Sequence, residues 1–142
     1  MASLAAWVAS ITLALAGCIS EPTTEPSPTP PTPSNPAQGP CSHLWQAGAA
    51  HQVLLRAIIL PASTASTEAV NVTFEKAGAV VDRNVTDRDG CIRFVAPGAG
   101  EHVAKGSRAD PGSSRCTYDG KRTVVVDREL VEDDLVLGKT CR

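Results

Sequence analysis

Apolar and polar residues alternate along much of the chain after residue 69. The pattern is clearest where Val70, Val72 and Phe74 are separated by single polar residues. Shorter segments that also contain Val, Ile, Leu or Phe follow at 80–81, 92–94, 102–104, 123–126 and 134–137. A period of two is typical of a β-strand with one buried face. The pattern therefore predicts a series of short strands.

A longer apolar run covers residues 53–60, where Arg56 is the one charged residue. Its length and its branched side chains favour a central strand that is covered on both faces. A short helix beginning near residue 44 is the alternative interpretation.

Turn signals separate these segments. Clusters of Gly, Pro and Asp lie at 76–78, 87–90, 97–100, 110–112 and 119–120. Six or seven short strands without a convincing amphipathic helix predict an all-β fold, a small antiparallel β-sandwich. Its predicted core consists of Val70, Val72, Phe74, Ile92, Phe94, Val124, Val126, Leu135 and Leu137.

The N-terminal segment differs from the rest of the chain. Residues 4–15 form an apolar run of 12 residues, which is too short for a transmembrane helix of about 20 residues and suits the core of a signal peptide. The run ends in Leu15-Ala16-Gly17-Cys18, a pattern that resembles the lipobox of bacterial lipoproteins. The resemblance implies that diacylglycerol is attached to Cys18, that the chain is cut before it, and that the new amine is acylated. An ordinary secretory signal is the alternative.

Proline dominates the segment that follows. Residues 21–40 contain eight of the 11 prolines, and proline fixes φ and lacks an N–H donor. We therefore expect a disordered, extended linker that spans at most roughly 60 Å. The predicted organisation is a signal peptide over 1–17, a lipidated cysteine with its linker over 18–40, and a β-sandwich domain over 41–142.

Charge excludes one class of partner. All 13 Lys and Arg lie after residue 40, and only Glu21 and Glu25 of the 15 acidic residues lie before it. The domain is thus formally neutral, and its longest basic run is Lys121-Arg122. Nucleic-acid binding needs clustered positive charge, so no nucleic-acid partner is expected.

Cysteine usage agrees with export. Besides Cys18 the sequence contains Cys41, Cys91, Cys116 and Cys141, an even number that predicts two disulfides in an exported domain. Three pairings are possible, and we favour Cys91–Cys116 with Cys41–Cys141. Free thiols or a zinc site are the alternatives, and the absence of C-x-x-C counts against zinc.

One stretch resembles a known domain family. Thr86-Asp87-Arg88-Asp89-Gly90, the apolar residues Ile92 and Phe94, and Pro97-Gly98 are similar to the carboxypeptidase regulatory-like domain, which has a transthyretin-like (prealbumin-like) β-sandwich. The similarity covers about 40 residues, and His102 stands where the family usually has tyrosine. The resemblance implies a fold more than a function.

Two enzyme families share this sandwich type, and the sequence fits neither. Intradiol dioxygenases bind iron through two tyrosines and two histidines, whereas Tyr118 is the only tyrosine here. Transthyretin-related hydroxyisourate hydrolases end in Y-R-G-S, whereas residues 138–142 read GKTCR. We therefore expect no catalytic residues and no cofactor.

Polar residues with a possible role are few. Asp87, Asp89 and Gly90 are interpreted as a turn, because D-x-D-G supplies too few oxygens for Ca²⁺.

Two hypotheses about function follow. The first is a non-catalytic structural or binding module, anchored by lipid on Cys18 to the cell membrane or outer membrane. Its domain would face away from the cytoplasm, toward an envelope protein or glycan. The second is a ligand-binding lipoprotein for metal or glycan that uses His43, His51 and Trp45. It requires the histidines, or Trp45 and Tyr118, to converge on one exposed face.

Overall fold

A computed structural model describes residues 26–61 and 65–142. The chain divides into two compact units, Met1–Pro31 and Thr32–Arg142. Residues 26–36 are exposed and belong to no helix or strand, as their proline content requires. The predicted signal peptide and Cys18 lie outside the described residues. No helix in the described ranges has the length and apolar composition needed to cross a membrane.

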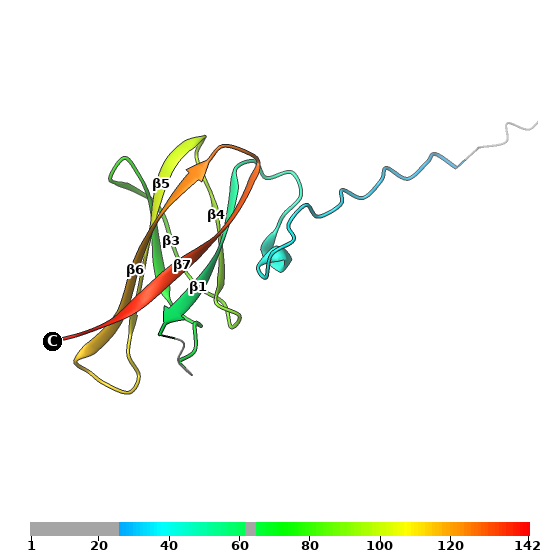
Figure 1. The fold of residues 1–142 in the computed structure, drawn as a ribbon. Helices are drawn as coiled ribbons and strands as arrows, with labels where there is room; N and C mark the ends of the chain where they lie inside the picture. Colours follow the sequence, from blue (N-terminus) through cyan, green and yellow to red (C-terminus); the bar gives the residue numbers. More distant parts are fainter. Residues whose placement is uncertain (1–25, 62–64) are drawn as a thin grey trace, which may run out of the picture. The chain divides into compact units, whose positions relative to one another are not determined.

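Strands make up nearly all of the regular structure in the second unit (Figure 1). The run 53–60 is strand rather than helix, and the short 3₁₀ helix η1 precedes it. The elements are η1 (Ser42–Leu44), β1 (Gln52–Leu60), β2 (Asn71–Lys76), β3 (Ala79–Val85), β4 (Cys91–Val95), β5 (Gly100–Ala109), β6 (Cys116–Val126) and β7 (Leu130–Cys141). The predicted small all-β sandwich is confirmed.

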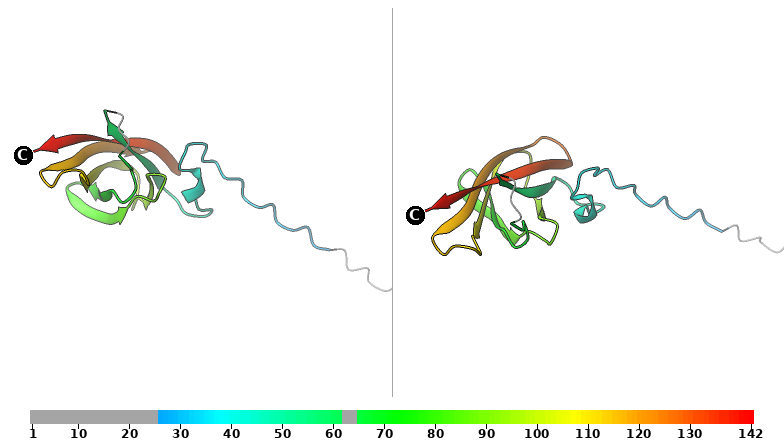
Figure 2. Two further views of the ribbon diagram at one scale, coloured as in Figure 1. Left: turned by 90° about the horizontal axis from the view of Figure 1, so that it is seen from below. Right: turned by 60° about the horizontal axis from the view of Figure 1, so that its bottom comes forward.

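The seven strands form one continuous sheet in the order β3-β2-β5-β6-β7-β1-β4. The sheet folds over so that its outer strands β3 and β4 approach each other, and Figure 2 shows the resulting two layers. One layer contains β3, β2, β5 and β6, and the other contains β7, β1 and β4. Pairing is antiparallel except between β1 and β7, which run parallel from Gln52↔Leu130 to Leu60↔Gly138. The expectation of antiparallel pairing throughout is wrong at this pair.

Strand β7 joins the two layers. It pairs with β6 only from Cys116↔Cys141 to Asp119↔Gly138, and the rest of its length pairs with β1. The backbones approach closely where β7 leaves β6, since a Cβ on Gly120 would lie 2.1 Å from the carbonyl oxygen of Val136. Only glycine fits at this corner.

The core lies between the two layers. All nine predicted core residues are buried, each at 3% exposure or less. Phe74 from one layer stacks on Phe94 from the other, with ring centroids 4.8 Å apart, and the ring of His102 also stacks on Phe74, at 5.0 Å between centroids. His102 is fully buried. Its Nδ1 bonds the Gly100 carbonyl oxygen, whereas its Nε2 has no partner among the described residues.

Both disulfides form, but not with the favoured pairing. Cys41 is bonded to Cys91 and Cys116 to Cys141; Cys91–Cys116 and Cys41–Cys141 are wrong. The physical reason is strand register, because Cys116 and Cys141 stand directly opposite each other on β6 and β7. Cys41 lies just before η1, beside the start of β4.

The segment before η1 is fixed to the domain. Ala37 is buried, and the backbone N–H groups of Gln38 and Gly39 donate to the two carboxylate oxygens of Glu132 at 3.2 and 2.9 Å. A Cβ on Gly39 would lie 2.6 Å from one of these oxygens. These contacts and the Cys41–Cys91 bond set the position of η1.

Candidate functional site

The turn between β3 and β4 has a defined internal structure. The Asp87 carboxylate oxygen Oδ1 accepts the backbone N–H groups of Asp89 and Cys91 at 2.9 and 2.8 Å. Gly90 has a φ of +77°, which glycine adopts without strain. The Asp89 carboxylate is exposed, 3.9 Å from Arg88 Nε. Residues 87–90 thus form a turn that is stabilised by hydrogen bonds to the Asp87 carboxylate.

Thr86 connects this turn to the chain before β2. Its hydroxyl is buried, donates to the Thr67 carbonyl oxygen at 2.6 Å and accepts the Val70 N–H at 2.9 Å. The first residue of the T-D-x-D-G motif therefore has a structural role that the motif alone does not indicate.

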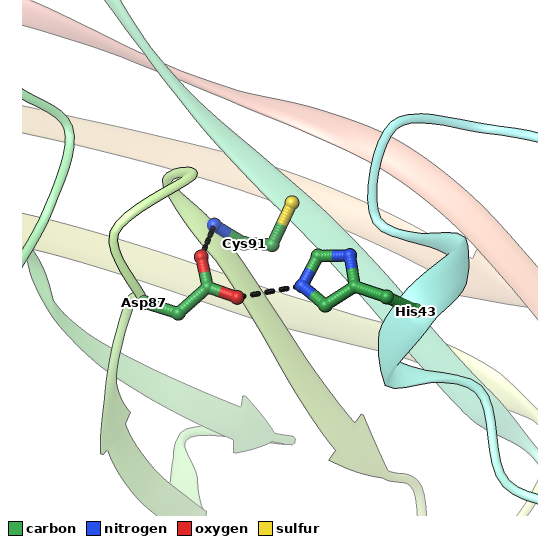
Figure 3. Close-up of side chains that lie close together, drawn as sticks. All are labelled: His43, Asp87 and Cys91. Carbon is green, nitrogen blue, oxygen red and sulfur yellow. Dashed lines mark hydrogen bonds and ion pairs between the residues drawn. The ribbon is translucent and has the colours of Figure 1, made fainter.

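The Asp87 carboxylate also meets a histidine from η1. His43 Nε2 lies 2.7 Å from Asp87 Oδ2, and the two side chains are 45% and 32% exposed. Figure 3 shows the pair beside Cys91. Burial alone would raise the pKa of the Asp87 carboxyl, but hydrogen bonds from His43, Cys91 and Asp89 outweigh it and lower that pKa below its ordinary value. The carboxylate is therefore ionised at neutral pH.

An open hollow of about 530 Å³ lies beside this pair. It separates η1 from the ends of β3 and β4, and its wall combines an aromatic ring with polar and charged groups. Its lining includes His43, Trp45, Thr86, Asp87, Cys91 and Arg93.

The convergence that the ligand-binding hypothesis requires is only partly present. His43 and Trp45 line the same hollow. His102 is in the core, and Tyr118 is 6% exposed, so neither can contact a ligand there. His51 is half-buried, and its buried Nδ1 has no hydrogen-bond partner within residues 26–61 and 65–142. The site therefore contains one histidine and one aromatic residue of those considered.

Three side chains of metal-binding type gather here. One ligand atom each from His43, Asp87 and Cys91 lies within 4.8 Å of the others. Cys91 is bonded to Cys41, and the thiolate is the form of cysteine that binds metals. In the disulfide form the cluster therefore offers one nitrogen and one carboxylate, too few for a structural zinc site.

No known protein family and no curated protein matches the sequence. Solved structures with a similar backbone include the following two. The 5-hydroxyisourate hydrolase of Klebsiella pneumoniae has a TM-score of 0.49 and 13% identity, covering 64% of this chain and 97% of that one. A DUF4876 family protein from Bacteroides thetaiotaomicron has a TM-score of 0.38 and 12% identity, covering 63% of this chain and 23% of that one. Both scores lie below 0.5, and neither likeness carries an argument about activity.

Proposed function

We propose that the chain is a lipid-anchored, non-catalytic binding module of the cell envelope. The observation that carries this proposal is the cysteine pairing. The four cysteines of the domain form two disulfides, and Cys18 is the one remaining cysteine of the five in the sequence. It has no disulfide partner left within the chain, and the Leu15-Ala16-Gly17-Cys18 pattern offers lipid as its modification.

The disulfides also support an address outside the cytoplasm, because such bonds persist in oxidising compartments. A lipidated Cys18 would carry two or three acyl chains. Stable attachment needs more than one such signal, so this anchor would hold the protein on the cell membrane or the outer membrane. The domain would then face away from the cytoplasm.

The chemistry of the hollow supports a non-catalytic role. Nucleophilic catalysis needs a hydroxyl or thiol next to a base. Cys91 is in a disulfide, and the one hydroxyl in the lining, on Thr86, is directed to the Thr67 carbonyl oxygen. His43 and Asp87 form an acid–base pair without a nucleophile beside them.

The intact mass of the mature protein tests the anchor. We expect the chain to begin at Cys18, to carry acyl chains and to enter solution only with detergent. Cys18→Ala should leave an unlipidated and uncleaved precursor, whereas Ser20→Ala, as a matched control, should be processed as the wild type. An unmodified Cys18 thiol in the wild-type protein would reduce the proposal to simple secretion.

A second candidate, a glycan ligand, is favoured by the position of Trp45. Aromatic rings bind sugar faces through apolar contact, and Arg93 and Asp87 supply polar groups in the same hollow. Trp7 lies in the predicted signal peptide, so Trp45 would be the one tryptophan of the mature chain. We expect envelope oligosaccharides to change its fluorescence, and Arg93→Ala to weaken that response. A response that survives Arg93→Ala unchanged would count against binding in the hollow.

A further inference from the structure

The Cys41–Cys91 disulfide and the His43–Asp87 pair occupy one place in the fold. The ligand atoms of His43, Asp87 and Cys91 lie within 4.8 Å of one another, and the sulfur of Cys41 is bonded to that of Cys91. Figure 3 shows the Cys91 sulfur, the imidazole and the carboxylate around a common space. Four potential metal ligands therefore come from the segment before β1, the β3–β4 turn and the start of β4.

These four groups match one class of ion. Zinc binds thiolate, imidazole and carboxylate in a tetrahedron with bonds of about 2.0–2.3 Å, which places the ligand atoms roughly 3.3–3.8 Å apart. The ligand atoms of His43, Asp87 and Cys91 already lie within 4.8 Å of one another. Cys41 lies outside this group, and its sulfur, now near the Leu55 carbonyl oxygen, must turn toward the other three. The sulfurs must part, and the 2.7 Å contact between His43 Nε2 and Asp87 Oδ2 must open.

We propose that reduction of the Cys41–Cys91 disulfide creates a zinc site formed by Cys41, Cys91, His43 and Asp87. An external dithiol supplies the two electrons: it becomes a disulfide, the Cys41–Cys91 bond breaks, and each cysteine sulfur takes one proton. Binding of Zn²⁺ then displaces these two protons. The inference does not depend on the lipid anchor.

The structure around the ligands supports this assignment. Asp87 Oδ1 is held by the N–H groups of Asp89 and Cys91, which leaves Oδ2 directed toward His43. His43 is 45% exposed and lines the open hollow with Asp87 and Cys91, so a hydrated ion has access. Reduction therefore frees two sulfurs at a place where an anchored carboxylate and an accessible imidazole are already present.

The second disulfide provides an internal comparison. Cys116 and Cys141 join two neighbouring strands, and across residues 26–61 and 65–142 the one cluster of metal-binding type is that of His43, Asp87 and Cys91. Reducing Cys116–Cys141 should free two thiols without creating a zinc site.

Zinc titration of the detergent-solubilised full chain tests the proposal. The affinity for Zn²⁺ is measured by competition with a chromogenic chelator under oxygen-free conditions. The measurement is made on the oxidised protein and again after a dithiol has reduced the protein and has been removed. We expect no tight binding by the oxidised protein and one ion per chain after reduction. His43→Ala and Asp87→Asn should each weaken binding at least about tenfold, the loss that even an outer partner of a metal ligand causes. The amide introduced by Asp87→Asn would keep an oxygen that can accept the N–H groups of the turn.

The control is Cys116→Ala combined with Cys141→Ala, which should bind zinc as the reduced wild type does. The proposal is overturned if reduced wild type binds no better than Cys41→Ala with Cys91→Ala, or if His43→Ala has no effect. If reduction unfolds the domain, zinc should restore its β circular dichroism in the wild type but not in His43→Ala. Failure to restore it would equally overturn the site.

Discussion

Removing the two disulfides separately should give two different losses of stability. In the chain-entropy account, a crosslink stabilises by restricting the unfolded chain, and the effect grows with the loop it closes. Cys41 and Cys91 are 50 positions apart, and Cys116 and Cys141 are 25 apart. The corresponding contributions are about 4 kcal/mol for the longer loop and about 3.5 kcal/mol for the shorter one.

Packing increases this difference. Cys41 and Cys91 are 3% and 1% exposed and belong to a second apolar cluster with Ala37 and Leu54, whereas Cys141 is exposed. Replacing buried sulfur by alanine leaves a void that costs about 1 kcal/mol in addition. Cys41→Ala with Cys91→Ala should therefore lose about 5 kcal/mol of unfolding free energy, which is a third or more of a typical domain's total.

Urea unfolding, followed by circular dichroism, measures both losses, and a crossed variant tests the pairing itself. Cys41→Ala with Cys141→Ala removes one partner from each bond and should leave two thiols, on the buried Cys91 and Cys116, that react with an alkylating reagent once the unreduced protein is unfolded in urea. It should also be less stable than either matched double variant. A crossed variant without reactive thiols would show that Cys91 and Cys116 are bonded instead, and would refute this reasoning.

Three further predictions concern single positions. His102→Phe should raise the unfolding free energy by about 1 kcal/mol, because it keeps a ring in the core stack and removes the buried Nε2, which has no partner in the described part of the chain. A lower urea midpoint would contradict this. Ala77 and Gly78, between β2 and β3, both have positive φ, a conformation that asparagine adopts more readily than alanine. Ala77→Asn should therefore raise the unfolding free energy by about 0.5–1 kcal/mol, measured by thermal unfolding. An unchanged unfolding temperature would argue against this turn. The Lys139 ammonium, and then the Gly112 N–H, lower the pKa of the Asp110 carboxyl. Asp110 therefore stabilises the fold above its unfolded pKa near 4, and this contribution is lost as pH falls through the lower folded value. Lys139→Met should make unfolding free energy less sensitive to acid between about pH 7 and about pH 3, and equal acid sensitivity would exclude this role of Lys139.

The strands could be predicted because their pattern is local. In β2, Val72 and Phe74 are buried while Asn71 is exposed and Thr73 only partly covered, as alternation requires. The parallel pairing of β1 with β7 joins segments nearly 80 positions apart. Both strands are apolar enough to pair in either direction, and the pairing of segments so far apart in the chain is decided only in the folded sandwich.

The outer strand β3 shows what periodicity alone misses. Its Val80, Val81 and Val85 are exposed, although they read as an apolar strand. Asp82 and Asn84 accept the N–H groups of the residues that follow them, at 2.7 and 2.9 Å. Natural sheets protect free edges with polar side chains of this kind. Every residue of β3 is exposed, so apolar and polar residues alike face solvent here, and a period of two does not indicate a buried face.

The candidate site could be predicted only in its parts. D-x-D-G identified the turn, because its bonds are formed within a few residues. The contact between His43 and Asp87 spans 44 positions, and it exists because Glu132 and the Cys41–Cys91 bond hold η1 next to β4. The favoured pairing would have placed Cys41 with Cys141 and left His43 without this neighbour. The correct disulfide is thus the step on which the geometry of the hollow depends, which is why its oxidation state should decide what the hollow can bind.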